Sequence, residues 1–147
     1  MEPRVATPQD YADILASLPS FWGQRDLRAL HHPMFLHEFG ETALVIRAPD
    51  GELVAYLLGF VTPDTAVGYV HLVGVRDSHR RRGFGRRLYA EFQRRARLRG
   101  ATSMKAITTP GNRASIDFHR SLGMTARLVA DYAGRGEDRV VFGSELE

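Results

Sequence analysis

The chain has 147 residues, of which 44% are hydrophobic, and it contains no cysteine. This length suits one globular domain, residues 1–147, and the lack of cysteine excludes disulfides, thiolate nucleophiles and zinc–thiolate sites. The formal net charge is only +3, yet ten arginines fall between Arg76 and Arg99, which indicates either a binding site for an anion or a solvated helix face.

Transmembrane and secreted classes are also disfavoured. No stretch approaches the ~20 apolar residues that a membrane span needs, and Met1–Asp10 lacks the apolar core of a secretory signal. We therefore expect a soluble cytoplasmic protein.

The amino-terminal part is expected to be mainly helical. After a short strand at Val5–Ala6, a helix with proline in its first turn is predicted from Pro8 to about Leu18, ending before Pro19. A second helix is predicted over Asp26–His37, broken or bent around its internal proline.

Three strands on short turns are expected next. Thr42–Ala48 and Leu53–Val61 are apolar, β-branched runs separated by the turn sequence Pro49–Gly51. Ala66–Val75 follows as a third strand. Sequential strands joined in this way form an antiparallel meander.

The apolar period then changes from two to three and four. It predicts a helix from Gly85 to Gly100, a strand at Ser103–Thr108, a helix at Asn112–Leu122 and final strands at Met124–Ala130 and Val140–Ser144. The expected fold is α/β (mixed α+β), with a mixed, mostly antiparallel sheet of six to seven strands flanked by about four helices on both faces.

The junction between the third strand and the arginine-rich helix has the features of a phosphate site. Val75–Arg86 reads VRDSHRRRGFGR, so a strand end, a basic loop and two glycines precede a helix start. Free amides and the dipole at a helix start attract anions, and glycines let the backbone approach them closely. The loop is not a P-loop, and it lacks the full GxGxxG and the later acidic residue of a dinucleotide-binding unit.

Two segments resemble the signatures of the GNAT superfamily of acyl-CoA-dependent N-acyltransferases. The strand-ending Val75, followed by Arg80, Gly83 and Gly85, matches the family's [Gln/Arg]-x-x-Gly-x-[Gly/Ala] motif. Asn112–Gly123 is similar to the family's Asn-containing helix that ends in Leu-Gly. The resemblance covers nearly the whole chain and implies a sheet splayed between strands Ala66–Val75 and Ser103–Thr108.

The resemblance also implies how acetyl-CoA would bind as co-substrate. The pyrophosphate would lie on the loop, and the pantetheine arm would pair with the strand end as a partial extra strand. The residues implied for these two contacts are Val73, Gly74, Val75, Arg80, Arg81, Arg82, Gly83, Phe84, Gly85 and Arg86. Asn112 would bind the pantetheine, flanked by Ser115 and Phe118, although Asn112 is also a plausible simple helix cap.

Acyl transfer to an amine needs a base, a donor to the carbonyl oxygen and stabilisation of the leaving thiolate. The resemblance assigns the oxygen to the amide of Val73 and the base to Tyr69 or His71. We prefer His71 because a histidine exchanges protons near neutral pH, the alternative being a histidine packed beneath the pocket. By the strand period of two, Tyr69 and His71 are expected on the same face as Val73 and Val75.

His119 occupies a position where the family often has a tyrosine that serves the leaving thiolate. His119 is therefore a candidate general acid, and it could also work through a water, contact the sulfur or be a helix-surface residue without a role. With no cysteine to carry an acyl group, we expect N-acetyl transfer by direct attack of a primary amine in a ternary complex.

The acceptor is left open by the sequence, although we favour a small-molecule amine over a protein amine. Relatives shape this pocket with the region Leu18–Phe39, where aromatic residues could line it and Glu38 or Glu41 could engage the ammonium group. The alternative is that these are ordinary core and surface residues. His31, His32 and His37 form a poor metal signature, so no metal is expected.

Two other functions compete with this interpretation. One is an acyl-CoA-binding regulatory domain with reduced catalysis, and the other, less favoured, is an arginine-rich nucleic-acid-binding module, for which no reader motif is present. Homodimers are common among relatives, so a homodimer is a further possibility.

Overall fold

A computed structural model describes all residues 1–147 and contains one seven-stranded sheet in the order β1-β2-β3-β4-β5-β7-β6. Neighbouring strands are antiparallel except for the parallel pair β4 and β5. The strands are β1 (Arg4–Val5), β2 (Ala43–Arg47), β3 (Leu53–Val61), β4 (Val67–Val75), β5 (Ser103–Thr108), β6 (Thr125–Val129) and β7 (Arg139–Glu145). The expected mixed, mostly antiparallel sheet is confirmed.

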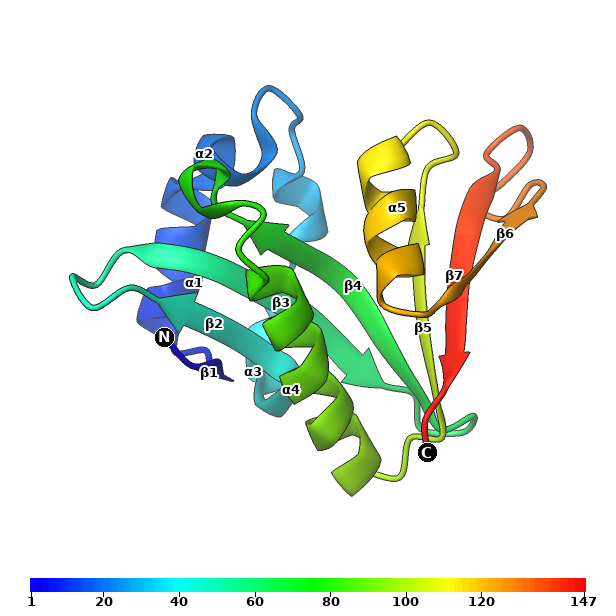
Figure 1. Ribbon diagram of the computed structural model, residues 1–147, viewed down its shortest axis with the longest axis horizontal. Helices are drawn as coiled ribbons and strands as arrows, with labels where there is room; N and C mark the ends of the chain where they lie inside the picture. The colour runs from blue at the N-terminus through cyan, green and yellow to red at the C-terminus, as the bar shows by residue number, and fades with distance from the viewer.

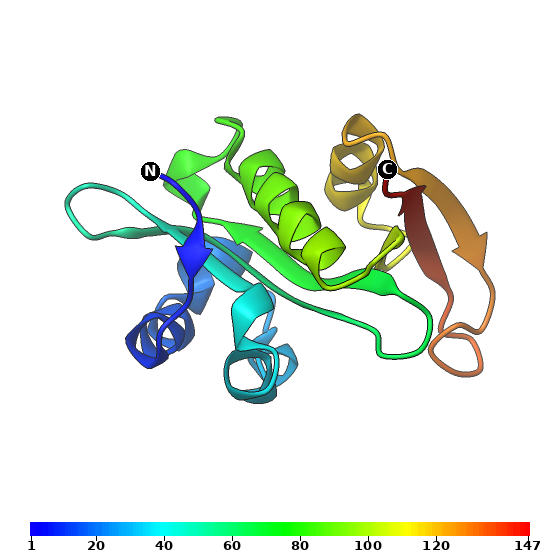
Figure 2. The ribbon, with the colours of Figure 1, turned by 90° about the horizontal axis from the view of Figure 1, so that it is seen from below.

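Helices cover both faces of this sheet. They are α1 (Pro8–Ala16), α2 (Leu18–Trp22), α3 (Met34–His37), α4 (Phe84–Leu98) and α5 (Arg113–Ser121), with short 3-10 helices η1 (Arg28–Leu30), η2 (Gly40–Thr42) and η3 (Asp77–His79). Figure 2 shows the amino-terminal helices on one face of the sheet and α4 and α5 on the other. Each face therefore has its own apolar layer.

The amino-terminal helices differ from the expectation. The first helix ends at Ala16, and α2 starts at Leu18 with Pro19 in its first turn, where a missing N–H is no disadvantage. The predicted helix over Asp26–His37 is wrong, because η1 and α3 replace it and Pro33 lies at the N-cap of α3. These short elements are held by tertiary contacts rather than by their own length.

The sheet opens between β4 and β5. Their pairing covers only Val67–Val70 against Ser103–Ala106, and beyond it the two strands diverge, with α5 beside the outer arm (Figure 1). The predicted splay is therefore present. Its opening lies at the end of β4 from which the phosphate-type loop leads into α4.

A β-bulge interrupts β4 just where this opening begins. Leu58 faces Leu72 while the next residue, Gly59, faces Val70, so His71 is the extra residue. A Cβ atom at Gly59 would stand 2.6 Å from the carbonyl oxygen of Tyr69. Strand β3 can approach the bulge of β4 this closely only because position 59 carries no side chain.

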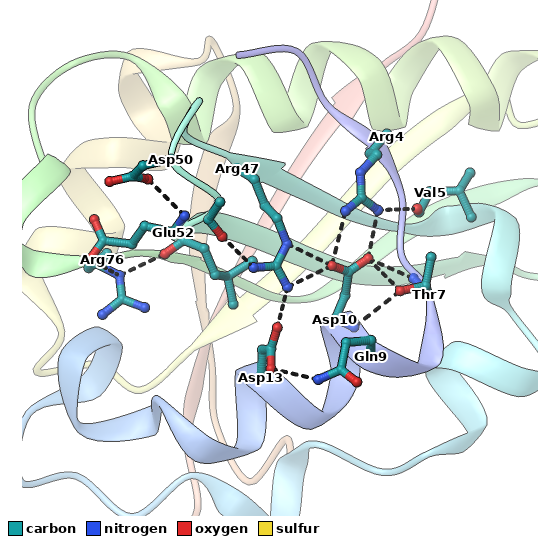
Figure 3. A network of polar contacts seen from close by, with 12 residues as sticks. Arg4, Val5, Thr7, Gln9, Asp10, Asp13, Arg47, Asp50, Glu52 and Arg76 are labelled. Carbon is teal, nitrogen blue, oxygen red and sulfur yellow. Dashed lines mark hydrogen bonds and ion pairs between the residues drawn. The ribbon is translucent and has the colours of Figure 1, made fainter.

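A buried carboxylate joins β1, α1 and β2 on the amino-terminal side (Figure 3). Asp10, 1% exposed, completes the capping box of α1 with Thr7 and accepts hydrogen bonds from Arg4 at 2.6 Å and Arg47 at 2.9 Å. Burial alone would raise its pKa, but the arginine and Thr7 donors outweigh that effect and hold the pKa well below its usual range.

Candidate active site

The loop before α4 presents a continuous run of free backbone donors. None of the amides from Arg80 to Arg86 donates to another group of the protein. Arg81 and Gly83 have positive φ angles of 63° and 81°, and left-handed residues in such a loop are typical of backbone nests that bind anions. Free amides at the start of a 15-residue helix could hold an anion, and phosphate groups are the usual anions at such helix starts.

The arginine side chains of this loop divide into two groups. Arg80 donates to the carbonyl oxygen of Phe21 at 2.7 Å, and Arg86 donates to that of Ser121 at 3.0 Å. These two guanidinium groups therefore tie the loop to α2 and to α5. Arg81 and Arg82 are exposed and have no protein partner, so they are the side chains free to meet phosphate oxygens.

The two glycines of the motif serve different purposes. Gly83 needs its positive φ at the N-cap of α4, where a side chain would meet open space. Gly85 is buried, and a Cβ there would stand 3.0 Å from the ring of Phe118. Gly85 thus allows α5 to pack closely against the first turn of α4, beside Phe84 in the core.

The end of β4 presents free backbone groups to the splay. The amide of Arg76 donates to Val54 of β3 at 2.8 Å. Hydrogen-bonded and non-hydrogen-bonded pairs alternate along an antiparallel ladder, so the register of β3 and β4 turns the N–H and C=O groups of Val73 and Val75 away from β3. They face the gap where β5 pairs no further, and an amide-rich chain could add there as a strand.

The expected common face of the β4 residues is wrong. Val73 and Val75 pack against the core on the α4 side, whereas Tyr69 and His71 contact Phe60 and Phe35 on the amino-terminal side. The bulge at His71 adds one residue and shifts the alternation by one position. Gly74 faces the amino-terminal side, where the ring of Trp22 covers it.

His71 is half-buried in a defined orientation. Its ring stacks on Phe35 with centroids 4.4 Å apart, and its Nε2 lies 2.8 Å from the carbonyl oxygen of Leu30. A carbonyl only accepts, so Nε2 carries the proton and Nδ1 keeps a lone pair without a protein partner. Burial lowers the pKa of His71, which keeps the ring neutral at neutral pH.

Tyr69 adds a second polar group next to His71. Its ring stacks on Phe60 at 5.3 Å, and its hydroxyl makes no hydrogen bond within the protein. Burial raises the pKa of Tyr69 to about 12, with a smaller contribution from Tyr132. The phenol therefore keeps its proton at neutral pH and can donate it.

His119 lies in the core rather than at the helix surface or in an open cleft. Its Nδ1 donates to the carbonyl oxygen of Ser115 at 2.7 Å, and its Nε2 accepts from the Tyr89 hydroxyl at 2.7 Å. The ring stacks on Phe142 at 4.1 Å and is 4% exposed. Burial lowers the pKa of His119, so the ring is neutral and has no free N–H.

Asn112 caps α5 and still has donors to spare. Its side-chain oxygen accepts from the amide of Ser115 at 3.2 Å. The side-chain NH₂ group makes no hydrogen bond within the protein. Capping and ligand binding are therefore compatible at this position. Phe118, six residues after Asn112, packs edge-on against Tyr89.

A recess of about 500 Å³ lies beside His71 on the amino-terminal face. Its lining is mainly apolar, from η1, α3, β3 and β4: Ala29, Leu30, Met34, Phe35, Phe60 and Tyr69. The remaining lining residues are His32 and His71. Glu38 and Glu41 do not contribute to it, contrary to expectation, and Glu41 instead pairs with Arg99, the residue that follows α4.

Three features of this region were not predicted from the sequence. Tyr89 belongs to the apolar stripe of α4, where a core tyrosine and a functional one have the same spacing. The network of His31, Tyr56 and Trp22, which joins η1 and α2 to β3 through bonds of 2.7 Å, has no local sequence pattern. Gly59 within an apolar strand was the one available signal for the bulge.

Comparison with known proteins agrees with this geometry. The family model described as the acetyltransferase (GNAT) family matches residues 9–124. No curated protein is detectably similar in sequence.

Three solved structures illustrate the similarity of the fold. Ard1 from Thermoplasma volcanium has 18% identity and a TM-score of 0.80, with 99% of this chain and 97% of that chain covered. The ribosomal-protein-alanine N-acetyltransferase from Brucella melitensis has 25% identity and a TM-score of 0.74, with 99% and 100% covered. The NatB acetyltransferase complex bound to CoA and MES has 15% identity and a TM-score of 0.79, with 100% of both chains covered.

None of the helices is both long and apolar enough to cross a membrane. The match to the family model shows the family, and the splayed sheet and the free amides before α4 agree with it. The chain therefore belongs to the GNAT family of acetyltransferases.

Proposed function

We propose that this acetyltransferase moves the acetyl group of acetyl-CoA to a primary amine by direct attack in a ternary complex. The observation that carries this proposal is the run of free amides from Arg80 to Arg86 beside the free edge of β4. One site for a pyrophosphate and one for an extended amide chain lie next to each other, as coenzyme A requires.

Acetyl-CoA supplies a thioester whose carbonyl carbon accepts the amine. The loop amides, with Arg81 and Arg82, would hold the pyrophosphate. Val73 and Val75 would pair with the pantetheine arm, and the free NH₂ group of Asn112 would donate to one of its carbonyl oxygens. The NatB complex of similar fold is itself described as bound to CoA.

His71 is the base in this mechanism. Its neutral ring has an unprotonated Nδ1, which can take the proton that the amine nitrogen loses as it bonds to the carbonyl carbon. The Val73 amide, turned into the splay, would donate to the carbonyl oxygen as negative charge develops there.

The leaving thiolate needs a proton when the carbon–sulfur bond breaks. We assign this donor to Tyr69, whose hydroxyl has no protein partner, rather than to His119, whose ring nitrogens are both engaged. His119 then serves the packing of α5, since its ring accepts a hydrogen bond from the buried Tyr89 of α4.

Replacement of His71 tests the base. His71→Gln can still donate to Leu30 but offers no basic nitrogen, and we expect kcat to fall by about 10²–10⁴. The measurement is thiol release from acetyl-CoA over a panel of primary amines. In the wild type, kcat/KM should rise with pH through the pKa of His71, because only the neutral ring accepts a proton, and this rise should disappear in the variant.

Tyr69→Phe should lower kcat while leaving the KM for acetyl-CoA unchanged.

His119→Phe, which keeps the packing on Phe142 but loses both hydrogen bonds, should lower thermal stability and retain the pH dependence due to His71. Near-wild-type kcat in His71→Gln would contradict the mechanism. If calorimetry shows that acetyl-CoA binds but no amine in the panel causes release of the thiol, the result would instead favour the acyl-CoA-binding regulatory domain.

A further inference from the structure

The recess beside His71 is the place where an acceptor would lie, because His71, whose free Nδ1 atom must meet the amine, is one of its lining residues. We infer that its preferred acceptor is a primary amine joined by a short linker to an apolar, aromatic or branched aliphatic group, without a second charge near the amine. This inference rests on the proposed function and names the substrate class of the same site.

The apolar character of the recess is the first argument. Leu30 and Met34 are 43% and 39% exposed, so two large apolar side chains face solvent at the mouth of the recess. Phe35, Phe60 and Tyr69 form its aromatic wall. An apolar substituent placed there would remove its own apolar surface and that of the recess from water at the same time.

The second argument is that the lining of the recess contains no charged side chain that could pair with a charge on the acceptor. No aspartate, glutamate, lysine or arginine lines the recess. A second ammonium group would find no carboxylate there, and a carboxylate or phosphate on the acceptor would find no basic side chain. Either charge would lose hydration without gaining a partner.

The positioning of His71 is the third argument. The Leu30 carbonyl and the Phe35 ring hold the imidazole from two sides, and both residues also line the recess. The apolar wall and the catalytic base therefore form one rigid unit. An apolar group against this wall would fix the distance between the amine and Nδ1.

Acetylation of primary amines that differ in their second group tests the inference. The probes are 2-phenylethylamine, 1,4-diaminobutane and 4-aminobutyrate, with thiol release from acetyl-CoA as the readout. We expect kcat/KM for phenylethylamine to exceed that for the other two by about tenfold or more. Equal use of all three amines would overturn the inference and leave the proposed function intact.

A paired variant locates the preference in the recess. Met34→Asp places a carboxylate at its mouth, so kcat/KM should fall about tenfold for phenylethylamine and rise for diaminobutane, at unchanged KM for acetyl-CoA. Leu98→Asp, at an exposed leucine of α4 (76% exposed) outside the recess, is the matched control and should change neither. A preference unaffected by Met34→Asp would place the acceptor elsewhere and overturn the inference.

Binding measurements separate this inference from the proposed function. Calorimetry of phenylethylamine and diaminobutane with the protein, with and without CoA, reports affinity even without turnover. Tighter binding of phenylethylamine that weakens in Met34→Asp supports the inference, and equal binding of both amines overturns it.

Short peptides with amino-terminal Phe or Asp serve as a further arm: acetylation of the Phe peptide but not of free phenylethylamine would identify the amine source as a polypeptide.

Discussion

Replacement of the buried carboxylate of Asp10 offers a sharp test of how the amino-terminal layer is held. Asp10→Asn keeps the side-chain shape but removes the charge that Arg4 and Arg47 share (Figure 3). It also weakens the capping box with Thr7 at the start of α1. The three elements β1, α1 and β2 would lose their common polar contact.

The size of the effect follows from the burial of the partners. Removing one partner of a buried ion pair costs about 3–5 kcal/mol. The side chain of Asp10 is 2% exposed, but those of Arg4 and Arg47 are 48% and 22% exposed, so water recovers part of the solvation of the two arginines. We therefore expect a loss of about 3 kcal/mol, at the lower end of that range, and a Tm lower by about 6–12 °C for a chain of this size.

Urea unfolding followed by the fluorescence of Trp22 measures this loss. Asp13→Asn is the matched control, because Asp13 also pairs with Arg47 but its side chain is 36% exposed against 2% for Asp10, and its effect should be much smaller. A loss below about 1 kcal/mol for Asp10→Asn, or equal losses for both variants, would refute the reasoning.

The pH dependence gives a second check on Asp10. The folded-state pKa lies below the unfolded value of about 3.9, so the stabilisation is complete above that pH and declines as pH falls toward the folded pKa. Asn does not titrate. The gap in unfolding free energy between wild type and Asp10→Asn should therefore be full at neutral pH and narrow below about pH 4.

Three further variants concern the two loop glycines and Tyr56 in the apolar layer on the amino-terminal face. Gly85→Ala would force its Cβ to within 3.0 Å of the Phe118 ring, so stability should fall by about 1–3 kcal/mol and KM for acetyl-CoA should rise; Gly83→Ala, strained by its φ of 81° but sterically open, should cost about 1–2 kcal/mol. Both are measured by denaturation and steady-state kinetics, and a harmless Gly85→Ala would contradict the close packing. Tyr56→Phe leaves Nε2 of His31 without its donor and should cost about 1–3 kcal/mol in urea unfolding, whereas an unchanged midpoint would show that water replaces the hydroxyl.

The local sequence determined most of the strands, the long helix and the loop between them. Leu53–Val61 and Ser103–Thr108 are strands over the residues predicted, and α4 differs from its prediction by one or two residues at each end. These elements have a clear apolar period and glycine or proline at their boundaries, so neighbouring residues already contain the information.

Only the tertiary structure decided the arrangement of the catalytic candidates. The bulge at His71, which separates the faces of Tyr69 and Val73, results from the close approach of Gly59 on another strand. The burial of His119 depends on Tyr89, which lies 30 residues earlier in the chain. Such contacts join distant segments and leave the local period unchanged, so the sequence by itself identified the candidate phosphate loop but not the geometry around His71 and His119.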